Sequence, residues 1–285
     1  MIDVATRPDA LEGWLEEPTT PETTAPETFV PETFVLVGHG SRDPRSAQAL
    51  ERLTARVASL TDAPVRLAFL ELSEPLLEDV LAQVSGRVRI VPLLLGSAFH
   101  ARVDLPGRLE AVAGTRADLE LSIAGVLGPH ALLDAAMAAP ARQLLAQGCD
   151  GLVLLGTGSS HVSANAEVDA LADRLGLALG VPVVAGFVTR GRTLPEAVEA
   201  VRRAGAARVG LVPWFLAPGL LLDSGLAVAR ELGVTVATGG ATQEAVTLAD
   251  DERLARLVLG RALEPASRLT ASAVDDASRR VLTAA

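Results

Sequence analysis

The sequence predicts an α/β protein made of two tandem copies of one unit, each with a parallel sheet of about four strands. Apolar runs of strand length alternate with longer helical patterns along most of the 285 residues. These short runs are continuously rich in Val, Leu, Ile and Ala, which is typical of parallel strands buried on both faces. The pattern recurs about 118 to 121 residues later, so the eight expected strands form two groups of four.

Each element follows in chain order from these runs. Strands are expected at 33–38, 64–70, 87–95, 120–125, 151–156, 182–188, 207–214 and 233–237. Helices are expected at 44–60, 75–85, 103–113, 130–147, 164–179, 193–204, 220–231 and 242–260. The first helix has a clear start, because Asp43 is a favourable N-cap residue and Pro44 suits the first helical position.

The repeat sets the expected domain limits. Residues 35–41 (VLVGHGS) match 152–159 (LVLLGTGS), and 90–95 (IVPLLL) match 211–216 (LVPWFL). We therefore expect an N-terminal domain at 33–148, a C-terminal repeat at 149–262 and a C-terminal tail at 263–285. The copies are expected to face each other across a cleft.

Charge and composition limit the kinds of partner. The net charge is −10, but residues 1–32 hold eight acidic residues against one Arg, which leaves the remainder near neutral. Without a basic stripe, nucleic-acid binding is not expected. Pro-Glu-Thr recurs in this segment, and its small apolar content predicts a disordered tail at 1–32.

Other features favour a cytoplasmic protein. No apolar run approaches the ~20 residues of a membrane-spanning helix, and the N-terminal segment does not resemble a secretory signal. The single Cys149 excludes an internal disulfide and a cysteine metal site. Every basic residue is Arg, so anionic ligands would be bound by guanidinium groups, which grip carboxylates in a bidentate way.

Two of the four histidines lie where an open parallel sheet builds its ligand site. His39 stands between Gly38 and Gly40 straight after the first expected strand, and His100 follows Gly96 after the third. Ligands bind beyond the carboxyl ends of such strands. Two imidazoles brought together there could hold a divalent metal or transfer protons.

The two copies differ where this chemistry is expected. Thr157 replaces His39, and the second copy has no histidine to match His100. We predict that the first copy is catalytic and that the second forms the opposite wall of the cleft. Of the other histidines, His130 is expected to open a helix, and His161 follows a Gly-Ser-Ser turn from which it could reach the cleft.

With these motifs assembled, the chain resembles the sirohydrochlorin chelatases, the class II tetrapyrrole chelatases, in their long two-domain form. Three motifs carry the likeness, each after the expected strand: 38–42 (GHGSR), 69–75 (FLELSEP), and 92–96 (PLLLG) followed by His100, Asp104 and Pro106. The likeness covers about residues 33–262. It implies two flavodoxin-like domains, each with helices on both faces of its sheet, around a central cleft.

The resemblance also implies an activity. Members of the family insert Fe²⁺, Co²⁺ or Ni²⁺ into a carboxylate-rich tetrapyrrole in sirohaem or cobalamin biosynthesis, so a lyase of this kind is expected, with Fe²⁺ favoured, Co²⁺ as the alternative and Ni²⁺ third. It needs no organic cofactor and no membrane. Its partners would be sirohydrochlorin and the metal ion, and internal duplication favours a monomer.

The site residues follow from the same resemblance. His39 and His100 would bind the metal and accept pyrrole protons, with Glu71 as an acidic assistant. Backbone N–H groups and Arg side chains would bind the substrate's carboxylates. The expected substrate-binding residues are Gly40, Ser41, Arg42, Ser97, Ala98, Phe99, Arg102, Thr157, Gly158, Ser159 and Ser160. Arg45, Arg190 and Arg192 also lie close to these loops in sequence.

Three other functions share some of these features. A histidine-dependent phosphatase or mutase needs an Arg directly before its nucleophilic His, and here the neighbour is Gly38. A nucleotide-binding module would need Gly-x-Gly-x-x-Gly or a phosphate-loop Lys, and neither is present. A non-catalytic tetrapyrrole or metal carrier of the same fold stays open, because only turnover separates it from an enzyme.

Overall fold

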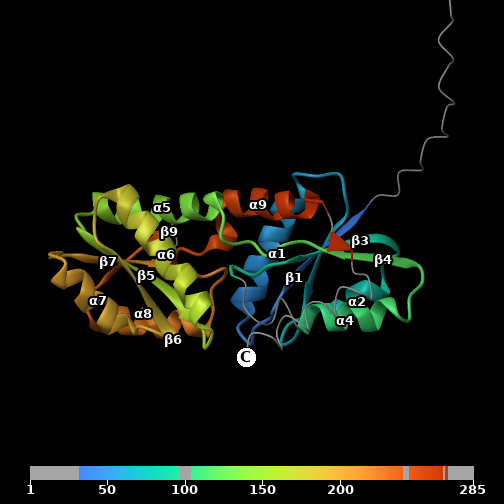
Figure 1. Ribbon diagram of the computed structural model, residues 1–285, viewed down its shortest axis with the longest axis horizontal. Coiled ribbons are helices and arrows are strands. Elements are labelled where there is room, and N and C mark those ends of the chain that lie inside the picture. The colour runs from blue at the N-terminus through green and yellow to red at the C-terminus, as the bar shows by residue number, and fades with distance from the viewer. Residues whose placement is uncertain (1–31, 97–103, 240–243, 266, 269–285) are drawn as a thin grey trace, which may run out of the picture. The chain divides into compact units, whose positions relative to one another are not determined.

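The computed structural model describes residues 32–96, 104–239, 244–265 and 267–268, which form two main sheets (Figure 1). In the first, the parallel strands lie in the order β2 (Val65–Phe69), β1 (Thr33–Gly38), β3 (Gly86–Pro92) and β4 (Leu119–Ile123), with a short antiparallel β11 (Ser267–Arg268) beside β4. In the second, they lie in the order β6 (Val183–Arg190), β5 (Gly151–Gly158), β7 (Val209–Pro213) and β8 (Thr235–Val236). The shared strand order confirms the predicted class of two tandem parallel α/β units.

Helices cover both faces of each sheet. On the first sheet, α2 (Leu77–Ala82) and α4 (Asp104–Ala113) pack against one face, and α1 (Pro44–Ala58) packs against the other. On the second, α7 (Leu194–Arg203) and α8 (Leu220–Glu231) cover one face, opposite α6 (Val162–Leu179). Successive residues of β1 face opposite cores, as a strand's pleat requires: Val35 lies with α2 and α4, and Leu36 lies with α1.

Two helices are exchanged between the repeats. Helix α5 (Ala131–Ala146) follows the first sheet along the chain but packs against β7 and α6. Helix α9 (Glu252–Leu263) follows the second sheet but packs against α1 and β3, and Figure 1 shows the red α9 beside the blue α1. One continuous core therefore joins the two halves. The limits 33–148 and 149–262 stay predictions, and each of these segments supplies a helix to the other's sheet.

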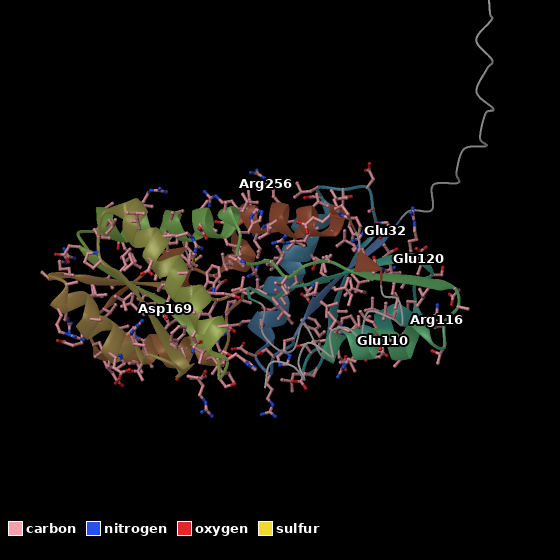
Figure 2. All side chains as sticks on the ribbon, in the orientation of Figure 1. Glu32, Glu110, Arg116, Glu120, Asp169 and Arg256 are labelled. Carbon is pink, nitrogen blue, oxygen red and sulfur yellow. The ribbon has the colours of Figure 1, made fainter. Side chains whose placement is uncertain are left out.

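Both ends of the folded chain meet at β3. The predicted tail at 1–32 lies outside the described residues except for Glu32, which Figure 2 labels just before β1 and whose carboxylate lies 3.3 Å from Nε of the buried Arg89. Arg89 also donates to the carbonyl oxygen of Glu264 at 3.0 Å. Beyond α9, only 264–265 and 267–268 of the predicted C-terminal tail are described.

The helix starts test the local sequence predictions. Asp43 caps α1 as expected, since its Oδ1 accepts a hydrogen bond from the backbone N–H of Arg45 at 3.0 Å. The helix expected at 242–260 was wrong in its first part. Strands β9 (Thr238–Gly239) and β10 (Glu244–Ala245) and a short 3-10 turn (Leu248–Asp250) come first, and α9 begins only after its N-cap, Asp251. The N–H groups of Leu248 and Ala249 bind the carbonyls of Phe215 and Leu216, which excludes a continuous helix there.

Asp43 gives a testable pH dependence. Hydrogen bonds from the side chain and backbone N–H of Arg45 hold the pKa of Asp43 below its ordinary value of 3.8. A carboxyl with a lowered folded-state pKa stabilises the fold above its unfolded pKa and loses that contribution as pH falls through the folded value. We expect Asp43→Asn, which keeps a capping side chain, to lower the free energy of unfolding at pH 7 and to differ progressively less from the wild type below about pH 4. Urea unfolding across this range measures the difference, and a constant difference would contradict the assignment.

Within the described residues, no helix is both long and apolar enough to cross a membrane.

Candidate functional site at the carboxyl edge of the first sheet

His39 and Glu71 are brought together by the pairing of β1 with β2. Each lies just beyond its strand, and the parallel ladder continues past both strand ends. The N–H of Leu70 donates to the carbonyl of Gly38, and the N–H of Glu71 donates to the carbonyl of His39, both at 3.0 Å. The backbone therefore holds these two residues side by side at the carboxyl edge of the sheet, where α/β proteins bind ligands.

The side chains of this pair also meet. Nε2 of His39 lies 3.2 Å from Oε1 of Glu71, and the two side chains are 47% and 53% exposed. An imidazole beside a carboxylate can accept a proton or bind a metal, and the carboxylate compensates the positive charge that arrives. The partial exposure leaves the pair open to a ligand.

Gly40 makes this arrangement possible. Its φ is +99°, a left-handed conformation that favours glycine, and a Cβ atom built there would lie only 1.6 Å from the carbonyl oxygen of Glu71. The loop that carries His39 therefore packs directly on the backbone of the loop that carries Glu71. Gly40 is expected to act through this packing as well as through any contact with substrate.

His100 is the predicted second metal-binding residue beside His39. His100 lies outside the described residues, as do Ser97, Ala98, Phe99 and Arg102. The described chain follows β3 as far as Gly96, and β3 lies next to β1 on the side opposite β2. Beyond β1 the chain continues to β2 on one side of the sheet, and beyond β3 it continues to β4 on the other side. The carboxyl ends of β1 and β3 are therefore the topological switch point, which is the usual ligand position in such sheets. The convergence of His39 and His100 stays a prediction.

The second half repeats the loop geometry without the pair. Gly158, the counterpart of Gly40, has φ +86°, and a Cβ atom built there would lie 2.3 Å from the carbonyl oxygen of Arg190. Arg190 therefore occupies the place of Glu71, and the exposed Thr157 occupies that of His39. The first half thus presents an imidazole and a carboxylate where the second presents a hydroxyl and a guanidinium.

A pocket of about 170 Å³ includes part of the second-half loop. Thr157, Gly158 and Ser159, which the sequence predicts to bind substrate, line it, whereas His39 does not. The first half contributes Leu95, Gly96, Pro129, His130, Leu133 and Asp134 to the lining. The pocket therefore lies between segments of both repeats, at the start of the chain segment that leads to His100.

Two of the arginines near the loops are already paired. Arg45 binds the carboxylates of Asp43 and, across the two repeats, Asp223, and these hydrogen bonds raise its pKa above the ordinary value. Arg192 donates to Asp169 at 2.8 Å and to the carbonyl of Ala185 at 2.9 Å. Neither has its guanidinium group free for a ligand.

Arg42 and Arg190 differ from Arg45 and Arg192. Both are exposed, and within the part of the chain that the structure describes, neither guanidinium group is hydrogen-bonded or ion-paired. They are therefore the better candidates for binding an anion.

The remaining predicted residues have mixed outcomes. His130 caps α5, because its Nδ1 accepts from the N–H of Leu132 at 3.1 Å, and this confirms its expected role. His161 precedes α6 and makes no side-chain capping bond. Two aromatic residues follow β7: Phe215 is buried in the core, whereas the half-buried Trp214 lines the pocket.

Two residues in the site had no role in the sequence prediction. Asn165 on α6 fixes the backbone of Ser159, since its Oδ1 accepts from the N–H of Ser159 at 2.9 Å. Asp223 joins the first turn of α8 to Arg45 on α1. A local signal existed for Asn165, which follows a Gly-Ser-Ser turn, but the pairing of Asp223 joins residues 178 positions apart and has no local signal.

Several known proteins are similar to this chain. A sirohydrochlorin ferrochelatase of Bacillus subtilis (strain 168) is 27% identical over 195 residues, 66% of this chain and 75% of that protein. A sirohydrochlorin cobaltochelatase of Methanosarcina acetivorans is 35% identical over 78 residues, 26% of this chain and 60% of that protein. The solved structure of SirB from Bacillus subtilis with Fe³⁺ superposes with a TM-score of 0.69 at 23% identity, and the match covers 83% of this chain and 96% of that one.

The family comparison covers both repeats. The CbiX profile matches residues 33–144 and matches again at 151–272. Each stretch contains the four parallel strands of one main sheet, and together they include most of the chain. The predicted resemblance to the long, two-domain sirohydrochlorin chelatases is confirmed, and the chain belongs to the CbiX family.

Proposed function

We propose that this chain is a lyase-type chelatase that inserts a divalent metal into sirohydrochlorin. The observation that carries the proposal is the contact between His39 Nε2 and Glu71 Oε1, at 3.2 Å, at the ligand-binding edge of the first sheet. The names of the two relatives above supply the substrate. An imidazole and a carboxylate at a half-exposed edge suit both tasks of metal insertion, which are binding a metal ion and removing protons.

The chemistry needs two proton acceptors. A divalent ion replaces two pyrrole N–H protons, so each turnover takes up one metal ion and releases two protons. The imidazole of His39 is the proposed acceptor that faces the ring, and the Glu71 carboxylate beside it compensates the charge or accepts the second proton. Nitrogen and oxygen donors hold Fe²⁺ or Co²⁺ without the tight grip of a thiolate cage, so the ion can leave for the ring.

His100 is proposed as the second imidazole on the strength of the sequence alone. Its place after β3, the neighbour of β1, is where a second ligand would be required. The metal is a substrate of this reaction, and no organic cofactor is needed.

The surroundings of His39 suit an apolar ring that carries carboxylates. Arg42, three residues beyond His39, is proposed to supply a guanidinium group for one carboxylate, and Arg190, beside Gly158 in the second half, to supply another. Three exposed leucines supply apolar surface: Leu72 beside Glu71, and Leu220 and Leu221 at the start of α8. A Cβ atom built at Gly219 would lie 4.0 Å from Oγ of Ser41, so the start of α8 is close to the His39 loop.

The pocket near Thr157 would take only an edge of the substrate. At about 170 Å³ it is smaller than the usual ~300–1,000 Å³ of a ligand site. We propose that it accepts one substituted pyrrole, with Gly158 and Ser159 at its rim and Ser160 beside them. We further propose that one chain is sufficient for activity, because the exchanged helices already complete both sheets within one molecule.

An anaerobic absorbance assay tests the function. Sirohydrochlorin is incubated with purified protein and Fe²⁺, Co²⁺ or Ni²⁺ in separate cuvettes, and the change of the tetrapyrrole spectrum is compared with protein-free controls. We propose Fe²⁺, the metal of the ferrochelatase relative, as the physiological metal and Co²⁺, the metal of the cobaltochelatase relative, as the alternative. The affinity order of first-row ions does not select Fe²⁺ over Co²⁺, so supply and geometry decide the metal. Rates equal to the protein-free controls with all three metals would contradict the proposal.

The free arginines give a prediction about substrate binding. We expect Arg42→Gln and Arg190→Gln each to raise KM for sirohydrochlorin about 10-fold, which corresponds to one charged hydrogen bond lost, with a smaller effect on kcat. The control is Arg203→Gln, because Arg203 is exposed on α7 and its nearest partner, Glu199, is 3.9 Å away. Steady-state kinetics separate KM from kcat, and a fall in kcat at constant KM would argue against carboxylate binding.

A further inference from the structure

One hydroxyl group joins the two loops of the His39–Glu71 pair. Oγ of Ser73 accepts a hydrogen bond from the backbone N–H of Ser41 and donates one to the carbonyl of Ser41, both at 3.0 Å. Ser41 lies two residues beyond His39, and Ser73 lies two residues beyond Glu71. The hydroxyl therefore connects the two loops at the positions two residues beyond His39 and Glu71.

Other bonds extend this connection. The N–H of Ser73 donates to the carbonyl of Glu71 at 2.8 Å, and Oγ of Ser41 accepts from the N–H of Asp43 at 3.1 Å. Between Glu71 and Ser73, Leu72 adopts a φ of +62°, a left-handed conformation that is unfavourable for a leucine. Such a conformation persists only where surrounding interactions enforce it. Ser73, the next residue in the chain, makes the hydrogen bonds described above.

The second half ties the same loop in a different way. Ser159, the counterpart of Ser41, also has both backbone groups bound by one side chain, but that side chain is Asn165 of α6, at 2.9 and 3.0 Å. Nδ2 of Asn165 also donates to the carbonyl of Arg190, the counterpart of Glu71, at 3.2 Å, so a residue of α6 joins the two loops there. In the first half the connecting side chain belongs to the loop that carries Glu71.

The loop lengths agree with this difference. An isolated bridge closes the loop after β2 between Phe69 and Leu76, and the loop after β6 between Phe187 and Thr193. The first loop is thus one residue longer, and Ser73 lies within it. Both halves therefore join the two loops, through Ser73 in the half that has the imidazole and through Asn165 and Thr189 in the half that lacks it.

We propose that Ser73 is a positioning residue for metal insertion, and that its hydroxyl sets the distance between the His39 imidazole and the Glu71 carboxylate. The proposal depends on the function proposed above. Ser73 contacts neither reacting group, and its effect passes through Ser41 to the His39 loop and through the backbone of Glu71 to the carboxylate.

The first test is kinetic. Ser73→Ala removes the hydroxyl, and Ser73→Thr keeps it. We expect the alanine variant to lower kcat about 10-fold at unchanged KM, which corresponds to the loss of one positioning contact, and the threonine variant to restore most of the rate. The control is Ser59→Ala, which also removes a hydroxyl bonded to a backbone carbonyl (2.7 Å to Arg56) but lies at the far end of α1. Ser73→Cys, of similar size and a weaker donor, should give an intermediate rate and serves if the alanine variant does not fold.

The second test does not require turnover. With only four histidines in the chain, the ring resonances of His39 in a ¹⁵N–¹H spectrum can be assigned by their loss in His39→Ala. We expect these resonances to shift in Ser73→Ala and to stay unchanged in Ser59→Ala. A Ser73→Ala variant with wild-type kcat and unshifted His39 resonances would overturn the proposal, as would a rise in KM at constant kcat. If the wild-type protein itself shows no insertion, the function fails, and the spectra still decide whether Ser73 positions His39.

Discussion

Replacing His39 with alanine is expected to lower kcat/KM for metal insertion about 10²- to 10⁴-fold, the usual contribution of a positioned acid–base group. The variant removes both the proposed metal ligand and the proton acceptor beside Glu71. Because the side chain is 47% exposed and packs in no core cluster, the fold should be retained. Initial rates at saturating metal, with circular dichroism to check the fold, measure the effect.

The matched control is His161→Ala. His161 lies just beyond the corresponding loop of the second half, is exposed, and makes no capping bond to α6. We expect its rate to stay within about twofold of the wild type, since surface changes of this kind have small effects. Equal losses in both variants, or normal turnover in His39→Ala, would contradict the assignment of His39.

Replacing Gly40 with alanine is expected to reduce both stability and activity. The new Cβ would lie 1.6 Å from the carbonyl oxygen of Glu71, so one of the two loops must move. The left-handed φ alone costs about 1–2 kcal/mol for a residue with a side chain, and the displaced contact adds to this. Because the movement separates His39 from Glu71, insertion should fall at least 10-fold even where the variant is folded. Urea unfolding and initial rates on the same samples measure the two effects.

Gly205→Ala is the control for backbone strain. Gly205 has nearly the same φ, +103°, but a Cβ atom built there meets nothing within 4 Å. It lies in the turn after α7, where we expect a stability loss of about 1–2 kcal/mol and an unchanged rate. If Gly40→Ala behaved like Gly205→Ala in both measurements, the close packing of the two loops would not matter to the site.

The strands, and the strand ends where the candidate site residues lie, could be predicted from local sequence patterns. Runs such as that of β1 are continuously apolar because both faces of the sheet are covered, and the glycines on either side of His39 indicated a tight turn beyond a strand. Asp43 and His130 act as helix caps, which depend on neighbours a few residues away. These predictions succeeded because the forces involved are local.

Other features depend on tertiary contacts that no local pattern contains. The exchange of α5 and α9 is one, because either helix could cover either sheet with the same apolar face. The helix expected at 242–260 began late because two backbone N–H groups bind the segment after β7 instead of continuing the helix. Arg45 lies close in sequence to the loops expected to bind the substrate's carboxylates, but its guanidinium group is already paired with Asp223 of the second half.

The measurement that tests the central claim most directly is the number of metallated tetrapyrroles formed per protein chain. Sirohydrochlorin and Fe²⁺ are supplied anaerobically in large excess over the wild-type protein and over His39→Ala, and product is followed to completion. An enzyme that works through His39 should form many products per wild-type chain, while the variant follows the protein-free rate. A plateau at one product per chain would identify a carrier instead, and multiple turnover by His39→Ala would exclude this imidazole from the reaction.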